Sequence, residues 1–101
     1  MKACEVRNGK DLMVYLKQCG AKILSNQTGD DYVTRIVVVN KNRRDDRINI
    51  AFTDGTIFWA THYWGSINKS FKPRPLHVVH MDNSERICKT IWGMSRKRNR
   101  A

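Results

Sequence analysis

The chain has 101 residues, of which 41% are hydrophobic, so it can form one domain with a single modest core. Its longest apolar run, 36–39, is far shorter than the roughly 20 residues of a membrane-spanning helix, and charged residues within the first ten positions do not fit a secretory signal, so we expect a cytoplasmic protein. Nineteen lysines and arginines against nine acidic residues give a net charge of +10, which favours a polyanionic partner.

The first predicted element is a short amphipathic helix that begins after Asn8. Asn8 is a good helix cap, and the carboxylate of Asp11 suits the positive end of the helix dipole. Apolar residues then recur at helical spacing, at Leu12, Tyr15, Leu16 and Cys19. Gly20 favours a left-handed helix end.

The next part of the chain has the pattern of antiparallel strands. Alternating and β-branched residues predict strands over 21–25, 32–39, 47–52 and 56–62, and a fifth over 76–81. Both faces of the 32–39 segment are apolar, which predicts a central strand. A turn is expected over 26–30 and a polar connector over 40–46. Asp54-Gly55 predicts a two-residue hairpin with positive φ at both positions.

A second helix and a basic tail complete the expected order. Asp82, Asn83 and Ser84 offer helix caps, and Gly93 is expected to end this helix. We predict a two-layer α+β domain over 1–94, with four to five antiparallel strands and both helices on one face of the sheet. The basic tail over 95–101 is expected to be disordered.

The cysteines and histidines indicate neither a disulfide framework nor a metal site. Three cysteines are an odd number, which favours reduced thiols. His77 and His80 would point to opposite faces of a strand, which works against shared ligation. No cofactor is expected.

Aromatic and basic residues together carry the main functional hypothesis. Trp59 and Tyr63 would share one face of a strand and Trp64 the other, so that at least one tryptophan should be exposed or covered by the basic segment that follows. That segment contains Lys69, Lys72 and Arg74. Exposed aromatic rings beside cations are typical of single-stranded nucleic-acid binding. Alternatively, both tryptophans pack in the core.

Two further basic clusters could contact phosphates. The first lies in the expected connector and contains Arg43, Arg44 and Arg47, among which Asp45 and Asp46 would cancel part of the charge. The second is the tail, with Arg96, Lys97, Arg98 and Arg100. The alternatives are a solvated hairpin tip and a solubilising end.

We therefore expect a non-enzymatic nucleic-acid-binding protein, with RNA or single strands preferred. One alternative is a small viral or mobile-element inhibitor or adaptor that binds an acidic host protein. Another is a small toxin-type ribonuclease that uses His62, His77 or His80. The helix–strands–helix order resembles that of double-stranded-RNA-binding modules and of small RNase toxins. However, an acidic stretch over 82–85 stands where the former carry lysines, so this resemblance implies no residue roles.

Overall fold

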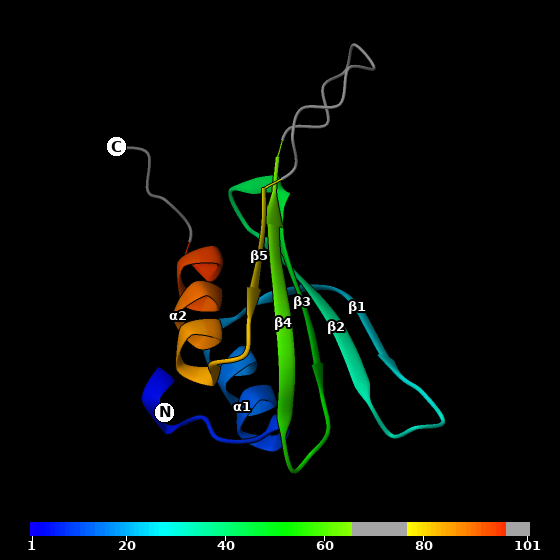
Figure 1. The fold of residues 1–101 in the computed structure, drawn as a ribbon. Coiled ribbons are helices and arrows are strands. Elements are labelled where there is room, and N and C mark those ends of the chain that lie inside the picture. The colour runs from blue at the N-terminus through cyan, green and yellow to red at the C-terminus, as the bar shows by residue number, and fades with distance from the viewer. Residues whose placement is uncertain (66–76, 97–101) are drawn as a thin grey trace.

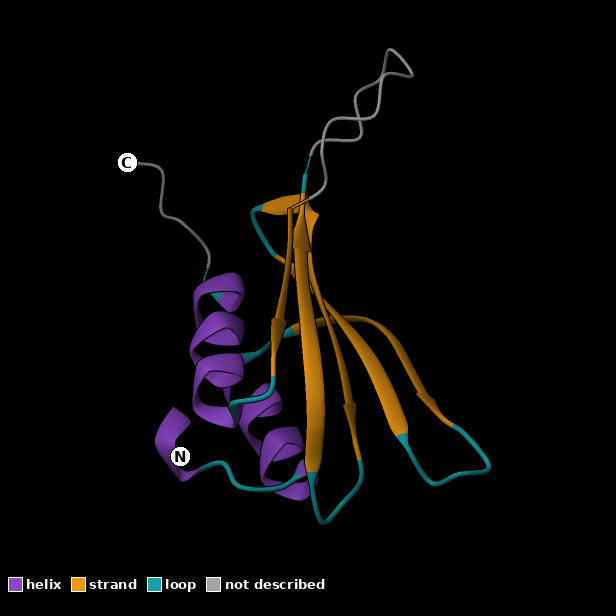
Figure 2. Cartoon of the chain, in the orientation of Figure 1, coloured by secondary structure: helices purple, strands orange, loops and turns teal. Residues whose placement is uncertain are grey.

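Two helices lie on one face of a five-stranded antiparallel sheet in the computed structural model, which describes residues 1–65 and 77–96 (Figure 1). The strands neighbour one another in chain order, and the helices form the second layer (Figure 2). This confirms the predicted two-layer α+β fold. In chain order, the elements are η1 (Ala3–Glu5), α1 (Gly9–Cys19), β1 (Lys22–Thr28), β2 (Thr34–Asn40), β3 (Arg43–Phe52), β4 (Ile57–Trp64), β5 (His77–Met81) and α2 (Ser84–Ser95).

Helix α1 has the predicted ends. The side chain of Asn8 accepts a hydrogen bond from the backbone N–H of Asp11 at 2.8 Å, which satisfies one free donor of the first turn. Gly20 adopts a left-handed conformation with φ of 65°, and its N–H bonds back to the last turn. Local sequence therefore fixes both ends of this helix.

Helix α2 begins as predicted but ends two residues later. Asn83 caps it by accepting from the N–H of Arg86 at 3.0 Å. The prediction that Gly93 ends the helix is wrong, because Met94 and Ser95 are buried and the Ser95 hydroxyl donates to the carbonyl of Ile91 at 2.7 Å. The last turn is thus held by the burial of Met94 and Ser95 together with a hydrogen bond within the helix.

Several of the predicted strand boundaries are also wrong. Strand β1 continues to Thr28, whose hydroxyl lies 2.9 Å from that of Thr34, and β2 begins at Thr34 rather than Tyr32, so the turn spans 29–33 rather than 26–30. Strand β3 begins at Arg43 rather than Arg47, which moves most of the expected polar connector into the sheet. Only residues 41–42 link β2 to β3, because the Asn40 side chain accepts from the N–H of Asn42 at 2.8 Å and tightens the turn.

The hairpin between β3 and β4 is confirmed, but its predicted turn type is wrong. Thr53 and Thr56 exchange two backbone hydrogen bonds, of 2.8 and 3.4 Å, around the turn. Neither Asp54 nor Gly55 has a positive φ, since Gly20 and Tyr32 are the described residues that do. A register shift at the first residues of β4 leaves Phe58 as an extra residue, which accommodates the different turn.

The core lies between the helices and one face of the sheet. Ile36, Ile50, Ala60 and Met81 face one another in a row across four strands, and each is at most 3% exposed. The helices cover this row with buried aliphatic side chains, chiefly Leu12, Leu16, Ile87 and Ile91. Because the apolar surface is buried on one side of the sheet, the helices cover that side and leave the opposite face without a helix in the described residues.

Gly9 is packed so closely that a side chain cannot be added. A Cβ atom there would overlap the carbonyl oxygen of Thr53 and lie 2.5 Å from Cδ2 of Phe52. We expect Gly9→Ala to lower the free energy of unfolding by about 1–3 kcal/mol, because overpacking displaces α1 from the sheet. Gly93→Ala is the control. Its Cβ meets nothing within 4 Å, so replacing a helical glycine should raise stability by about 0.5–1 kcal/mol. Urea denaturation measures both values, and equal stabilities would contradict this role of Gly9.

Candidate functional site

The face of the sheet opposite the helices carries three rows of side chains, which we call the open face. Strand register places them between the core residues, because successive side chains on a strand point to opposite sides. The rows are, from β1 toward β5, Lys22, Val39, Arg47, Tyr63 and Val78, then Ser25, Val37, Asn49, Thr61 and His80, then Gln27, Arg35, Ala51 and Trp59.

Aromatic rings lie on the β4–β5 side of the open face. Trp59 is 39% exposed, as the alternation in β4 predicted for at least one tryptophan, and its ring centroid lies 6.0 Å from that of His80. Tyr63 donates a hydrogen bond to Oδ1 of Asn49 at 3.3 Å, which holds the phenol against the sheet. The buried residues of this face, Val39 and Ala51, are separate from the core cluster. Short buried side chains therefore lie next to the rings of Trp59 and Tyr63, which are accessible to a flat ligand such as a nucleotide base.

The three rows of the open face contain cations and no acidic residue, and the carboxylates of Asp31 and Asp45 beside them pair with Arg35 and Arg43. Its charged side chains are Lys22, Arg35 and Arg47, one on each of the first three strands. Arg47 donates through Nε to the carbonyl oxygen of Arg44 at 3.1 Å, whereas Arg35 pairs with Asp31 at 3.2 Å at the edge of the face. Such a surface attracts anions, and no carboxylate within the three rows opposes them.

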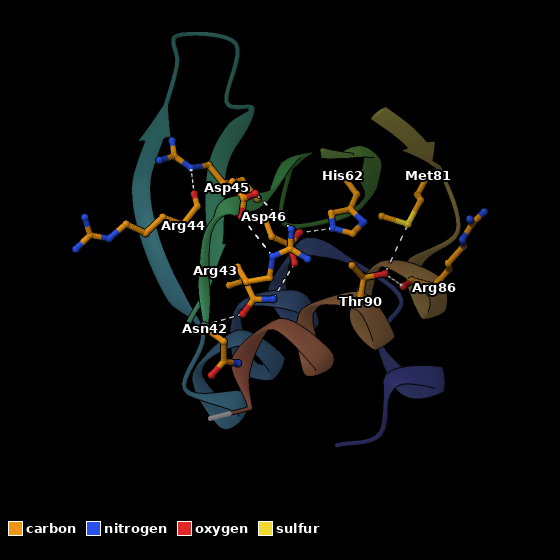
Figure 3. A network of polar contacts seen from close by, with 11 residues as sticks. Asn42, Arg43, Arg44, Asp45, Asp46, His62, Met81, Arg86 and Thr90 are labelled. Carbon is orange, nitrogen blue, oxygen red and sulfur yellow. Dashed lines mark hydrogen bonds and ion pairs between the residues drawn. The ribbon is translucent and has the colours of Figure 1, made fainter. Parts of the chain in front are cut away.

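Arg43 and Arg44 lie at the start of β3, next to one end of the open face (Figure 3). Both are exposed, and Arg43 pairs with Asp45 at 3.3 Å. The hydrogen bond to Asp45 raises the pKa of the Arg43 guanidinium above its ordinary value. The structure therefore brings Arg43, Arg44 and Arg47 together at one end of β3, as a cluster in a strand rather than in a loop.

Trp64 does not belong to the open face. It lies on the other side of β4, where its ring is 4.7 Å from that of His62 and 5.4 Å from that of His77. His80 is on the open face, so strand register separates it from the other two histidines, and His77 and His80 point to opposite faces as predicted. The three histidines therefore do not converge on one site.

A polar network around Asp46 was not predicted from the sequence. Oδ1 of Asp46 lies 2.6 Å from Nε2 of His62, and Oδ2 accepts a hydrogen bond from the Asn40 side chain at 2.7 Å. Figure 3 shows His62 directed at Asp46. The network joins β2, β3 and β4 where the sheet extends past the core, and it turns the Asp46 charge away from the open face.

Several predicted contact residues cannot be placed. Lys69, Lys72, Arg74, Lys97, Arg98 and Arg100 lie outside the described residues. Arg96 is described, and its guanidinium lies 5.6 Å above the ring of Trp92, on the helical side of the molecule. Arg96 is therefore separated from the open face by the sheet.

The described cysteines are unpaired and lie away from the open face. Cys4 is exposed, Cys19 is half-buried and Cys88 is buried. Burial raises the pKa of the Cys88 thiol to about 12, so it is protonated and unreactive at neutral pH. Within 1–65 and 77–96, no three histidine, cysteine or acidic side chains are grouped to hold a metal ion.

The chain matches no family model, no curated protein and no solved structure. None of the helices in the described ranges has both the length and the apolar character needed to cross a bilayer.

Proposed function

We propose that this protein binds nucleic acid, with RNA or other single strands preferred, through the open face of its sheet. The observation that carries the proposal is the position of Trp59. A large aromatic side chain, 39% exposed, lies on the helix-free face beside His80, in rows that hold cations and no acid. Proteins bind unpaired bases by stacking them on such rings while cations follow the phosphates.

Each group on the open face has a role in this proposal. Trp59 and Tyr63 provide ring faces for two bases, and His80 extends the surface next to Trp59. Arg47, which lies opposite Tyr63 on β3, contacts the phosphate backbone. Asn49 and Thr61 lie side by side in the middle row and supply hydrogen-bonding groups for base edges. Binding of this kind requires no covalent step, which is why we favour a binding protein over an enzyme.

Further cations extend the contact beyond the open face. Arg43 and Arg44 lie at the end of β3 from which Arg47 also projects. We include in the proposal the basic residues that sequence reasoning selected outside the described ranges, namely Lys69, Lys72, Arg74, Lys97, Arg98 and Arg100. A cytoplasmic location belongs to the same proposal.

The salt dependence of binding tests this function. We expect the affinity for a fluorescently labelled oligouridylate to fall steeply between low and physiological salt, because each neutralised phosphate releases counterions. The log–log slope should be about −0.7 per phosphate contacted, or about −3 for four contacts. Fluorescence anisotropy at several potassium chloride concentrations measures this slope. A flat dependence, or no binding at low salt, would refute the proposal.

Purification from cells separates the alternatives. Under the proposal, the protein leaves the cell with nucleic acid, and nuclease treatment removes the bound material. If one defined acidic protein remains bound after nuclease treatment, the adaptor alternative is favoured. Cleavage of labelled RNA that is abolished by His62→Ala would instead establish the ribonuclease alternative.

A further inference from the structure

Strand β1 is an exposed edge of the sheet. It is the outermost strand, it is seven residues long, and Lys22 is its one charged residue. Ile23 and Leu24 are 36% and 49% exposed. Edge strands of monomeric proteins normally carry inward charges, prolines, bulges or a covering segment that prevents pairing with another chain; of these devices β1 has one bulge, at Leu24. The other edge, β5, is shorter and is packed against α2.

An apolar groove lies beside the beginning of this edge. It has a volume of about 610 Å³ and is lined by residues of α1 and of the α1–β1 junction, chiefly Met13, Val14, Leu16, Lys17, Ala21 and Ile23. Val14 is 52% exposed in it. Its charged groups are cationic, since Lys17 is in the lining and the Lys41 ammonium lies 3.4 Å from where a Cβ on Gly20 would stand. The groove thus combines an apolar floor with a positive rim.

The turn over 29–33, at the far end of β1, has an exposed aromatic ring and acidic side chains, which are complementary to the apolar and basic groove. Tyr32 is 82% exposed and has φ of 63°, a left-handed conformation that is unfavourable for a bulky residue. Two backbone hydrogen bonds stabilise this conformation: the N–H of Gly29 donates to the carbonyl of Val33 at 3.1 Å, and the N–H of Tyr32 donates to the carbonyl of Gly29 at 3.0 Å. The Asp31 side chain also accepts from the N–H of Val33. Asp30 is exposed and has no hydrogen-bond or ion-pair partner among the described residues.

We propose that two copies of this chain form a dimer by antiparallel pairing of their β1 strands. A two-fold axis through Ser25 brings the two strands side by side around the bulge at Leu24, so that the Lys22 end of one copy lies next to the Thr28 end of the other. Because the strands run antiparallel, the turn that contains Asp30 in one copy lies next to the α1–β1 junction of the partner. Each hairpin tip therefore reaches the groove of the other copy, and the contact occurs twice.

Charge and shape both favour a second copy as the occupant. Asp30 at the tip meets the rim formed by Lys17 and Lys41 of the other copy, since Asp31 is already paired with Arg35 of its own chain, and the two Lys22 side chains are kept apart at opposite ends. Tyr32 is the large side chain at the tip, and the apolar groove provides a place to bury its ring. Burial in the partner accounts for the strained backbone at Tyr32, because strain is kept where the fold gains a contact from it.

A charge-swap experiment tests the dimer. We expect nuclease-treated wild-type protein to sediment as a dimer of 2 × 11.8 = 23.6 kDa at micromolar concentration. Asp30→Lys and Lys17→Glu should each raise the dimer dissociation constant about tenfold, and the double variant should restore it to within about threefold of wild type. Asp54→Lys is the control, because it makes the same charge change at the exposed β3–β4 turn and should leave the dimer intact.

Tyr32→Asn provides an independent readout. Asparagine tolerates the left-handed conformation, so this variant should keep or raise its melting temperature as a monomer while it loses the dimer. A wild-type protein that is monomeric at 100 μM would overturn the inference. So would a Tyr32→Asn variant that dimerises normally, or a double charge swap that fails to restore association. Dimerisation through β1 needs no nucleic acid, so these results are separate from those of the binding test.

Discussion

Trp59→Ala is expected to weaken binding of single-stranded RNA by about 10- to 100-fold. Stacking of one base on an aromatic ring contributes about 1–3 kcal/mol, and Trp59 is more exposed than Tyr63, the other large aromatic side chain in the three rows. The loss should be similar for short oligonucleotides of different sequence, because every base has a face that can stack. Anisotropy of a labelled oligouridylate at low salt measures the change, and binding should also quench the tryptophan fluorescence of the wild-type protein.

Trp92→Ala is the matched control for this prediction. Trp92 is 48% exposed, which is comparable to Trp59, but it lies on α2 in the helical layer, under the Arg96 guanidinium. We expect its removal to change RNA affinity less than twofold. Circular dichroism shows whether either variant has lost its fold. Equal losses from the two substitutions would mean that the open face is not where RNA binds.

Asn49→Asp is expected to lower RNA affinity about tenfold with little change in fold. Asn49 lies in the middle row of the open face, and the substitution replaces an amide by a carboxylate of the same size. The Tyr63 hydroxyl can still donate to the new side chain, as it does to Oδ1 of Asn49. A negative charge a few ångströms from a bound phosphate costs about 1–4 kcal/mol, depending on how far water is excluded.

Gln18→Glu makes the same amide-to-carboxylate change outside the open face. Gln18 is an exposed residue of α1 that contacts Met1. The two variants have identical net charge, so a difference between them reports the position of the charge rather than its amount. We expect Gln18→Glu to bind RNA within twofold of wild type. If both variants lose affinity equally, the protein attracts RNA through its overall charge alone.

The elements of this fold could be predicted because they depend on short-range patterns. Asn8 and Gly20 determine the ends of α1 through groups within one turn, and apolar residues on both faces of 32–39 are enough to predict an interior strand, which is β2. The predicted end of α2 was wrong because contacts with residues distant in the sequence determine where this helix ends. Helix α2 passes Gly93 because its last turn is held by the β2–β3 turn, where the N–H of Lys41 donates to the carbonyl of Met94 at 2.9 Å.

The candidate site was predictable in part. Alternation in β4 places Trp59 and Tyr63 on one face without reference to other strands, and the structure has them there. The Asp46 network could not be found in the same way, because Asn40, Asp46 and His62 come from three strands whose register depends on an irregularity between β2 and β3. Nothing near Asp46 in the sequence shows that its charge is directed away from the cations of β3.

The order of the strands has a consequence for synthesis of the chain. Each strand pairs with the one made immediately before it, so the sheet can assemble hairpin by hairpin as the polypeptide leaves the ribosome. The apolar face of that nascent sheet stays partly uncovered until α2 has been synthesised. A chain truncated before Ser84 would therefore be prone to aggregation, and chaperones and proteases of the cell would act on it.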